Sequence, residues 1–289
     1  MYKKYEALSP EEFAKVFKKK YFSCVIIYAL VMFAFIAAGL AIVFSNPYSW
    51  LVEHFTGTLV TILLICTFVL IIRISLVAYS LQNIIVSQCD PQKFIDVIEI
   101  LEKNFTFRNI RKSHYIFYIP ALIDLEKYDE ATDYITKITT HKDSAYRRLT
   151  LVYFKAVIAY RLEKFDEFKA YHQEFKDIYG VGKMAGFQQK NANMYLELLE
   201  CMQNILDENY DKPVTVYQKY MEKDKTKRAQ ITYSNGIAKI MDKKGDLAGA
   251  LIYYDKVVTL GADAKLPIIS RAKERHQELV EIVNGKKEG

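Results

Sequence analysis

Tryptophan, proline, glycine and closely spaced cysteine are scarce in this chain. Its 289 residues include one Trp, six Pro and eleven Gly, so turn signals are few and the short, evenly spaced strands of an all-β fold are not expected. The four cysteines, Cys24, Cys66, Cys89 and Cys201, are far apart and form no CxxC pair. This spacing excludes the common zinc motifs and predicts free thiols in a reducing compartment.

Catalytic motifs are also missing. The five histidines are scattered, and the sequence contains no P-loop, GxGxxG, GxSxG or HExxH motif. Adjacent carboxylates such as Asp129-Glu130 and Asp166-Glu167 stand where helices are expected to begin, and acidic residues stabilise a helix at that end. We therefore expect no enzyme, no cofactor and no metal ion, with an enzyme of unrecognised type as an alternative. The sequence contains no concentrated basic stripe, so we do not expect it to bind nucleic acid.

Charge is absent from one long stretch near the N-terminus. Ser23–Ser45 contains no charged residue, and the sequence stays almost uncharged to residue 81. About 20 apolar residues in a helix cross a hydrocarbon core of ~30 Å. We predict a transmembrane hairpin over residues 23–81, with spans at residues 23–45 and 58–79. A cleaved signal peptide is the alternative for the first span, but its apolar region is only about 7–15 residues long.

The residues that flank the spans predict an orientation. Lysines precede the first span, whereas the connecting segment Asn46–Gly57 contains no Lys or Arg. Because positive residues stay on the cytoplasmic side, we expect a multi-pass protein of the cell membrane with both termini in the cytosol. The residues expected to anchor the chain at the two membrane surfaces are Lys18, Lys19, Lys20, Trp50 and Arg73.

Residues 1–22 predict a short basic amphipathic helix in the cytosol. Ser9 is a typical N-cap, Pro10 suits the first helical position, and Glu12 completes a capping box. Phe13 and Phe17 share a face opposite the lysines. We expect this helix to lie on the inner leaflet, where its lysines approach anionic lipid.

From residue 88 to residue 289 the apolar periodicity is that of helices, so the fold class is all-α. One motif returns along this region. Leu125-Glu-Lys-Tyr128 comes back as Leu162-Glu-Lys-Phe165 after 37 residues, Tyr210-Asp211 continues the series after 45, and Lys244–Leu247 closes it after another 37. Each copy is expected to be the tight turn of a helical hairpin.

The best copy resembles the tetratricopeptide repeat family. It comprises Ile237-Ala238, the Gly245-Asp246 turn, Ala250 and Tyr253-Tyr254, which is similar to that family's small residues at helix crossings, tight turn and aromatic spacers. The sequence departs from the family at Phe168 and Pro213, where alanine is usual. Generic antiparallel hairpins are therefore the alternative. The last helix, over residues 266–283, is expected to cap the array.

The resemblance implies a function for residues 88–289. Tetratricopeptide arrays bind peptide segments on a concave face, and a face with tyrosines and cations suits a partner protein with acidic character. This predicts a membrane-anchored scaffold or adaptor. The alternative is an accessory subunit of a larger transport or secretion complex, held by small residues around Gly39 in the first span. The residues expected on the partner-binding face are Tyr153, Tyr160, Arg161, Asn235, Lys239 and Lys243.

The orientation is testable by cysteine accessibility. Ser49→Cys, in the predicted outer loop, should react with a membrane-impermeant thiol reagent added to intact cells, because both termini are expected inside. The four native cysteines provide the background in the unsubstituted protein. Labelling at residue 49 only after lysis would contradict the predicted topology.

Overall fold

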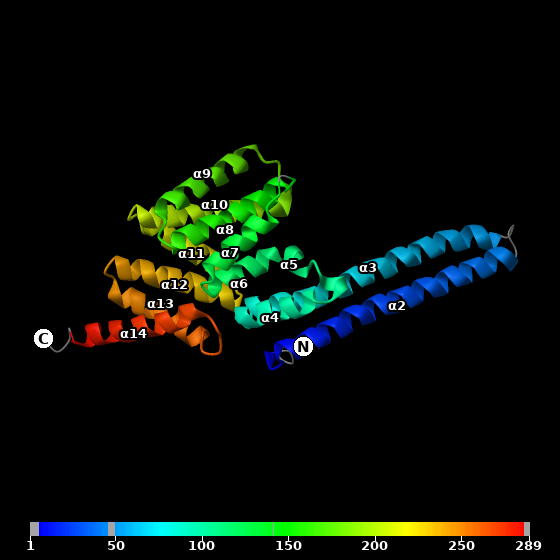
Figure 1. The fold of residues 1–289 in the computed structure, drawn as a ribbon, viewed down its shortest axis with the longest axis horizontal. Helices are drawn as coiled ribbons and strands as arrows, with labels where there is room; N and C mark the ends of the chain where they lie inside the picture. The colour runs from blue at the N-terminus through cyan, green and yellow to red at the C-terminus, as the bar shows by residue number, and fades with distance from the viewer. Residues whose placement is uncertain (1–5, 46–49, 141, 286–289) are drawn as a thin grey trace.

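The computed structural model describes residues 6–45, 50–140 and 142–285, which are helical almost throughout (Figure 1). These residues contain no strand, so the predicted all-α fold class is confirmed. The elements in chain order are α2 (Pro10–Ser45), α3 (Trp50–Val86), α4 (Pro91–Glu102), the 3₁₀ turn η1 (Phe105–Phe107), α5 (Ile110–Ser113), α6 (Tyr115–Asp124), α7 (Tyr128–Ile138), α8 (Ala145–Arg161), α9 (Phe165–Val181), α10 (Gly186–Leu206), α11 (Asp211–Lys223), α12 (Lys227–Lys243), α13 (Leu247–Leu260) and α14 (Pro267–Gly285).

Helices α2 and α3 form a long antiparallel hairpin that projects from the rest of the molecule (Figure 1). They contain 36 and 37 residues, or about 54 Å at a rise of 1.5 Å per residue. Their apolar side chains point outward, with Phe33 72% exposed and Leu64 67% exposed. The chain therefore has two helices near its N-terminus that are long and apolar enough to cross a membrane.

The N-terminal segment differs from the prediction because it is not a separate helix. The capping box forms as predicted, since Ser9 Oγ accepts from Glu12 N at 3.2 Å and Glu12 Oε2 accepts from Ser9 N at 2.9 Å. From Pro10, however, α2 continues without a break into the apolar span. Phe13 and Phe17 are 2% and 5% exposed. Protein already covers this face, so the helix does not offer it to lipid.

The cover is supplied by α4. Asp90 caps α4 by accepting from Lys93 N at 3.0 Å, and Pro91 occupies the first turn. The helix runs back along the ends of α2 and α3, where Phe13 joins Phe94 and Ile98 in one core (Figure 1). This three-helix joint connects the hairpin to the helical array without a flexible linker.

The array consists of helical hairpins whose turns share one backbone conformation. Glu126, Glu163 and Glu208 have φ angles of 61°, 57° and 57°, and Gly245 has a φ of 78°. These left-handed residues lie 37, 45 and 37 residues apart, which is the spacing of the sequence motif. At each turn the following amide bonds to a carbonyl five residues earlier, as Lys127 N does to Leu122 O at 2.9 Å. This bond is the signature of a Schellman helix end.

The array bends back on itself, so its C-terminal helices return to the start (Figure 1). Arg228 at the beginning of α12 bonds through Nε to Asp124 Oδ2 at the end of α6, at 2.7 Å. Lys265, between α13 and α14, donates its backbone N–H to Cys89 O at 3.0 Å. The Cys89 side chain is fully buried among α12–α14, and burial raises the pKa of its thiol to about 11. The C-terminal part thus packs on the connection between α3 and α4.

Glycine-to-alanine substitution should have opposite effects at Gly245, which lies at a left-handed turn, and at Gly180, which lies in a helix. Gly245→Ala should lower the free energy of unfolding by about 1 kcal/mol, because a Cβ disfavours a left-handed residue. The added Cβ meets no atom within 4 Å at either Gly245 or Gly180, so a clash cannot explain the difference. Gly180→Ala, in the last turn of α9, should instead raise stability by up to about 0.5 kcal/mol. Denaturant unfolding of the full chain in detergent measures both. Equal effects would contradict the assigned turn.

Candidate functional site

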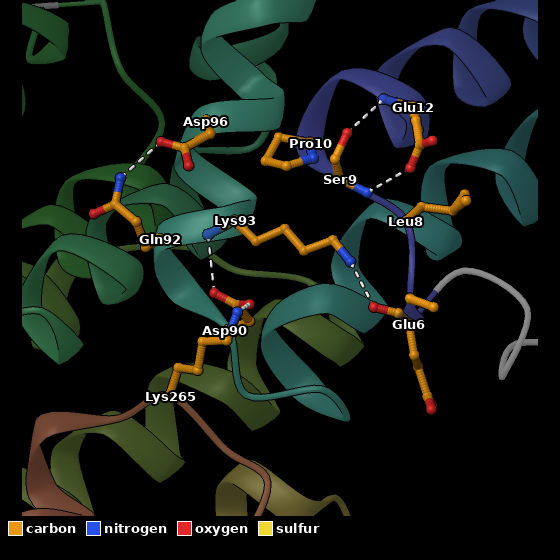
Figure 2. A pocket seen from close by; sticks show the side chains of 11 residues that line it. Glu6, Leu8, Ser9, Pro10, Glu12, Asp90, Gln92, Lys93, Asp96 and Lys265 are labelled. Carbon is orange, nitrogen blue, oxygen red and sulfur yellow. Dashed lines mark hydrogen bonds and ion pairs between the residues drawn. The ribbon is translucent and has the colours of Figure 1, made fainter.

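An open cleft of about 470 Å³ lies where the N-terminal segment meets the start of α4 and the connection between α13 and α14 (Figure 2). Several charged side chains line it, among them Glu6, Asp90, Lys93 and Lys265. Charged groups that converge in a cleft are candidates for binding or catalysis, so their partners decide what the cleft can do.

The two lysines of the cleft have partners within it, one a backbone carbonyl and one a carboxylate. The Lys93 ammonium donates to Glu6 O at 3.0 Å across the cleft, and Asp90 Oδ2 pairs with Lys265 Nζ at 2.8 Å. Burial lowers the pKa of Lys93, which is 7% exposed, and Asp90 acts in the opposite direction. On one wall Gln92 Nε2 donates to Asp96 Oδ1 at 2.7 Å. The cleft is therefore a polar joint that ties both ends of the array to the N-terminal segment.

Tyrosines fill much of the space inside the curved array, including two of the residues predicted to bind a partner. Tyr153 stacks on Tyr195 with ring centroids 4.3 Å apart, and burial raises its pKa. Tyr160 packs edge-on against Phe168 at 5.5 Å. Asn235 is only 4% exposed. Tyr153 and Tyr160 are thus half-buried and pack against neighbouring rings, and Asn235 is buried, so the partner-binding role expected of these three residues stays a prediction.

The predicted cations behave differently. Arg161 at the end of α8 and Lys239 and Lys243 on α12 are all exposed. None of the three forms an ion pair or a side-chain hydrogen bond with any residue that the structure describes. Arg271 on α14 is also exposed and pairs with Glu126 at the α6–α7 turn. We call Arg161, Lys239, Lys243 and Arg271 the cation cluster.

The electrostatics of Lys239 show that the cluster is compact. Its pKa is lowered from the ordinary value, first by burial and then by the positive charges of Arg161 and Arg271, while Glu126 raises it. Lys239 nevertheless retains a large solvent-accessible surface. The charges that act on Lys239 come from α8, α12, α14 and the α6–α7 turn. The cluster is therefore a positively charged surface shared by α8, α12 and α14.

Sequence reasoning found three of these cations and missed Arg271. The repeat register pointed to Arg161, Lys239 and Lys243, because these residues end or line the first helices of their hairpins. Arg271 belongs to the helix predicted only to cap the array, and no local pattern signals that the array bends back to place it beside the α6–α7 turn. Tyr128 was missed for the same reason, although Arg161 and Arg271 both act on its pKa.

The structure also gives the relative level of the predicted membrane anchors. Tyr28 on α2 hydrogen-bonds to Thr67 on α3, O to O at 2.9 Å. Arg73 lies six residues beyond Thr67, and Phe22 lies six residues before Tyr28. In an antiparallel pair with equal rise, Arg73 and Phe22 are therefore level. The anchoring residues nearest this level are Lys18, Lys19 and Lys20. Trp50 begins α3, and its side chain lies outside the described residues.

Comparisons with known proteins add no assignment to this geometry. No protein-family model matches the chain, and searches of the curated proteins and of the solved structures found no match. The proposal for its function therefore rests on its own residues.

The lowered pKa of Lys239 leads to a prediction about stability. Lys239→Gln should raise the free energy of unfolding at pH 7, because it removes a cation that burial and its neighbours disfavour. A lysine whose folded pKa is below its ordinary 10.5 destabilises the fold at neutral pH, and this penalty is lost as pH rises through the folded value. The gain from Lys239→Gln should therefore shrink towards pH 10.5.

Denaturant unfolding of the full chain at neutral and alkaline pH measures this difference. Lys169→Gln, on the exposed side of α9, is the matched control and should change stability little at either pH. A loss of stability in Lys239→Gln at pH 7 would show that this charge supports the fold instead of opposing it.

Proposed function

We propose that this protein is a membrane-anchored scaffold that recruits a partner through an acidic segment. The α2–α3 hairpin would hold the chain in the cell membrane with both termini in the cytosol. The helical array would present the cation cluster to a partner protein. The cation cluster would bind the acidic segment of the partner and would catalyse no reaction.

The cation cluster is the observation that carries the proposal. Three exposed cations, Arg161, Lys239 and Lys243, gather without acidic partners among the described residues, and the only carboxylate paired with the cluster is Glu126. Burial, and then the positive charges of Arg161 and Arg271, lower the pKa of Lys239, so neighbouring cations add to the cost of its charge. A ligand with carboxylates would relieve this repulsion. The same arrangement would attract acidic partners from a distance and repel basic ones.

The surroundings of the cluster suit a peptide-like ligand. Arg161 can bind a carboxylate through two parallel hydrogen bonds, whereas the lysines act as point charges. Next to Arg161 in the sequence, Tyr160 packs edge-on against Phe168, which would help to hold the end of α8 in place. A pre-formed binding surface lowers the entropy lost on binding. Repeated helical hairpins, as in the tetratricopeptide family that the sequence resembles, would supply a concave surface for such a ligand.

The joint between hairpin and array fits the same role. Since α2 is one helix from the capping box to the end of the apolar span, the array cannot swing freely about a linker. Burial of Phe13 and Phe17 against α4 fixes its direction. A partner bound at the cation cluster would therefore be held at a defined orientation to the bilayer.

An accessory subunit of a larger transport or secretion complex is the second candidate, and one observation favours it. Ala37, Ala38 and Ala41 are exposed on the surface of α2 around Gly39. Small residues let the backbones of membrane helices approach closely. In this case the contact with the partner would lie within the bilayer, and the cation cluster would not be needed.

The charge variant Arg161→Ala/Lys243→Ala tests the scaffold. Both side chains are exposed, so the fold should persist while binding weakens by about tenfold for each lost anchor of ~1.4 kcal/mol. The measurement is quantitative recovery of cross-linked partners from cells that produce the full chain, after equal membrane levels and helicity have been verified.

Two further variants separate the candidates. Lys169→Ala/Lys176→Ala removes two exposed charges from α9 and should leave recovery unchanged. Ala37→Leu/Ala41→Leu enlarges the small-residue face of α2. Loss of partners in this variant, together with full recovery in Arg161→Ala/Lys243→Ala, would contradict the scaffold and support the accessory subunit.

A further inference from the structure

The 3₁₀ turn η1 and the short helix α5 lie at the end of the array nearest to the apolar part of the hairpin. Helix α4 starts at the far end of α3 and runs back along it, so that its C-terminus points towards the hairpin (Figure 1). Residues 103–112 follow directly. The proposed scaffold function assigns no role to this segment.

Aromatic packing fixes the segment beside the first residues of the apolar span. The Phe107 ring lies 5.7 Å from Phe17, 5.0 Å from Tyr21 and 5.9 Å from Phe22. Phe107 and Ile110 are 7% and 6% exposed, so both hold the segment to the protein core. Because Phe22 immediately precedes the uncharged stretch, the turn is held at the level where the apolar surface of α2 begins.

Several residues on either side of these two buried positions are exposed. Phe105 is 79% exposed, although it is a large aromatic side chain, and the Arg108 guanidinium lies 4.8 Å from the centre of its ring. Lys103 and Lys112 are exposed as well. No acidic residue occurs between residues 103 and 123. The outward face therefore combines one protruding aromatic ring with three cations.

This face is level with other positive charges. Phe22 is at the height of Arg73, as the Tyr28–Thr67 hydrogen bond indicates, and Lys19 and Lys20 directly precede it on α2. Basic residues around a protruding aromatic ring, next to an apolar helix, match the surface of a bilayer with anionic headgroups. An acidic protein would match the charges but not the adjacent apolar helices.

We propose that η1 and α5 form a second membrane contact, in which Phe105 inserts among the lipids of the inner leaflet and Lys103, Arg108 and Lys112 bind anionic headgroups. The proposal rests on the membrane anchoring by α2 and α3 that is part of the proposed function. It adds that the array itself touches the bilayer, so its orientation is fixed by lipid as well as by the joint.

Single tryptophan reporters test the contact in the full chain. Since Trp50 is the only native tryptophan, Phe105→Trp in a Trp50→Phe background places one fluorophore at η1. Ile252→Trp in the same background is the control for an exposed apolar residue away from the hairpin, because Ile252 is 69% exposed on α13. Phe33→Trp reports on the anchor, about 16 Å beyond Phe22 along α2.

Each protein is reconstituted in nanodiscs that contain phosphatidylglycerol, with brominated lipid as the quencher. We expect Trp emission at residue 105 to shift to shorter wavelength and to be quenched by brominated lipid, while emission at residue 252 is quenched only by aqueous acrylamide. Lys103→Gln/Arg108→Gln/Lys112→Gln should reduce the quenching at residue 105, as should zwitterionic nanodiscs.

The outcomes separate this contact from the anchor. Quenching at residue 33 without any at residue 105 would overturn the second contact and leave the hairpin anchored. Absence of quenching at residue 33 would overturn the membrane anchoring and the contact together. Shielding of residue 105 from acrylamide without quenching by brominated lipid would point to a protein covering it, which also overturns the lipid contact. Undiminished quenching in the triple glutamine variant would overturn the role of the cations.

Discussion

The burial of Phe13 and Phe17 against α4 is the contact on which the rest of the arrangement depends. These side chains belong to the same uninterrupted helix as the first apolar span, and they join a core that reaches α6, α7 and α8. Burying an aromatic side chain is worth about 1.5–3 kcal/mol, and here it also fixes a direction. It holds η1 next to Phe22 and sets the angle at which the array leaves the hairpin. Leu81, Ile84 and Ile85 of α3 are buried in the same core, so both helices of the hairpin are held to the array.

The return of the array to its own beginning shapes the charged surface. The Arg228–Asp124 bond and the Arg271–Glu126 pair join helices that are far apart in sequence, and both involve the end of α6 and its turn. This closure places Arg271 among the cations of α8 and α12. Tyr153 and Tyr160 pack against other rings within the array, whereas the side chains of the cation cluster are exposed.

Local patterns were sufficient to predict the helices, the apolar hairpin and the spacing of the turns. The 37, 45 and 37-residue spacing appears in the structure because each turn needs the same left-handed residue, three times Glu and once Gly245. Contacts between distant segments were not predictable. Arg228 and Asp124 are separated by 104 residues, and no periodicity links them. Tyr153 and Tyr160 were expected on a concave face because the family resemblance implies one, and no local pattern signals the rings of Tyr195 and Phe168 that pack against them.

The closure also has a mechanical consequence. An open stack of helical hairpins extends like a spring, because small rotations between neighbouring units add up along its length. Here the far end is attached to the near end through Lys265 and Cys89, beside the joint with the α2–α3 hairpin. A pull on the rim is therefore shared by two connections in parallel, one along the chain and one across the closure. Extension requires two contacts to break first, the hydrogen bond from Lys265 N to Cys89 O and the Arg228–Asp124 pair. Until they break, the array should resist stretching as a rigid body.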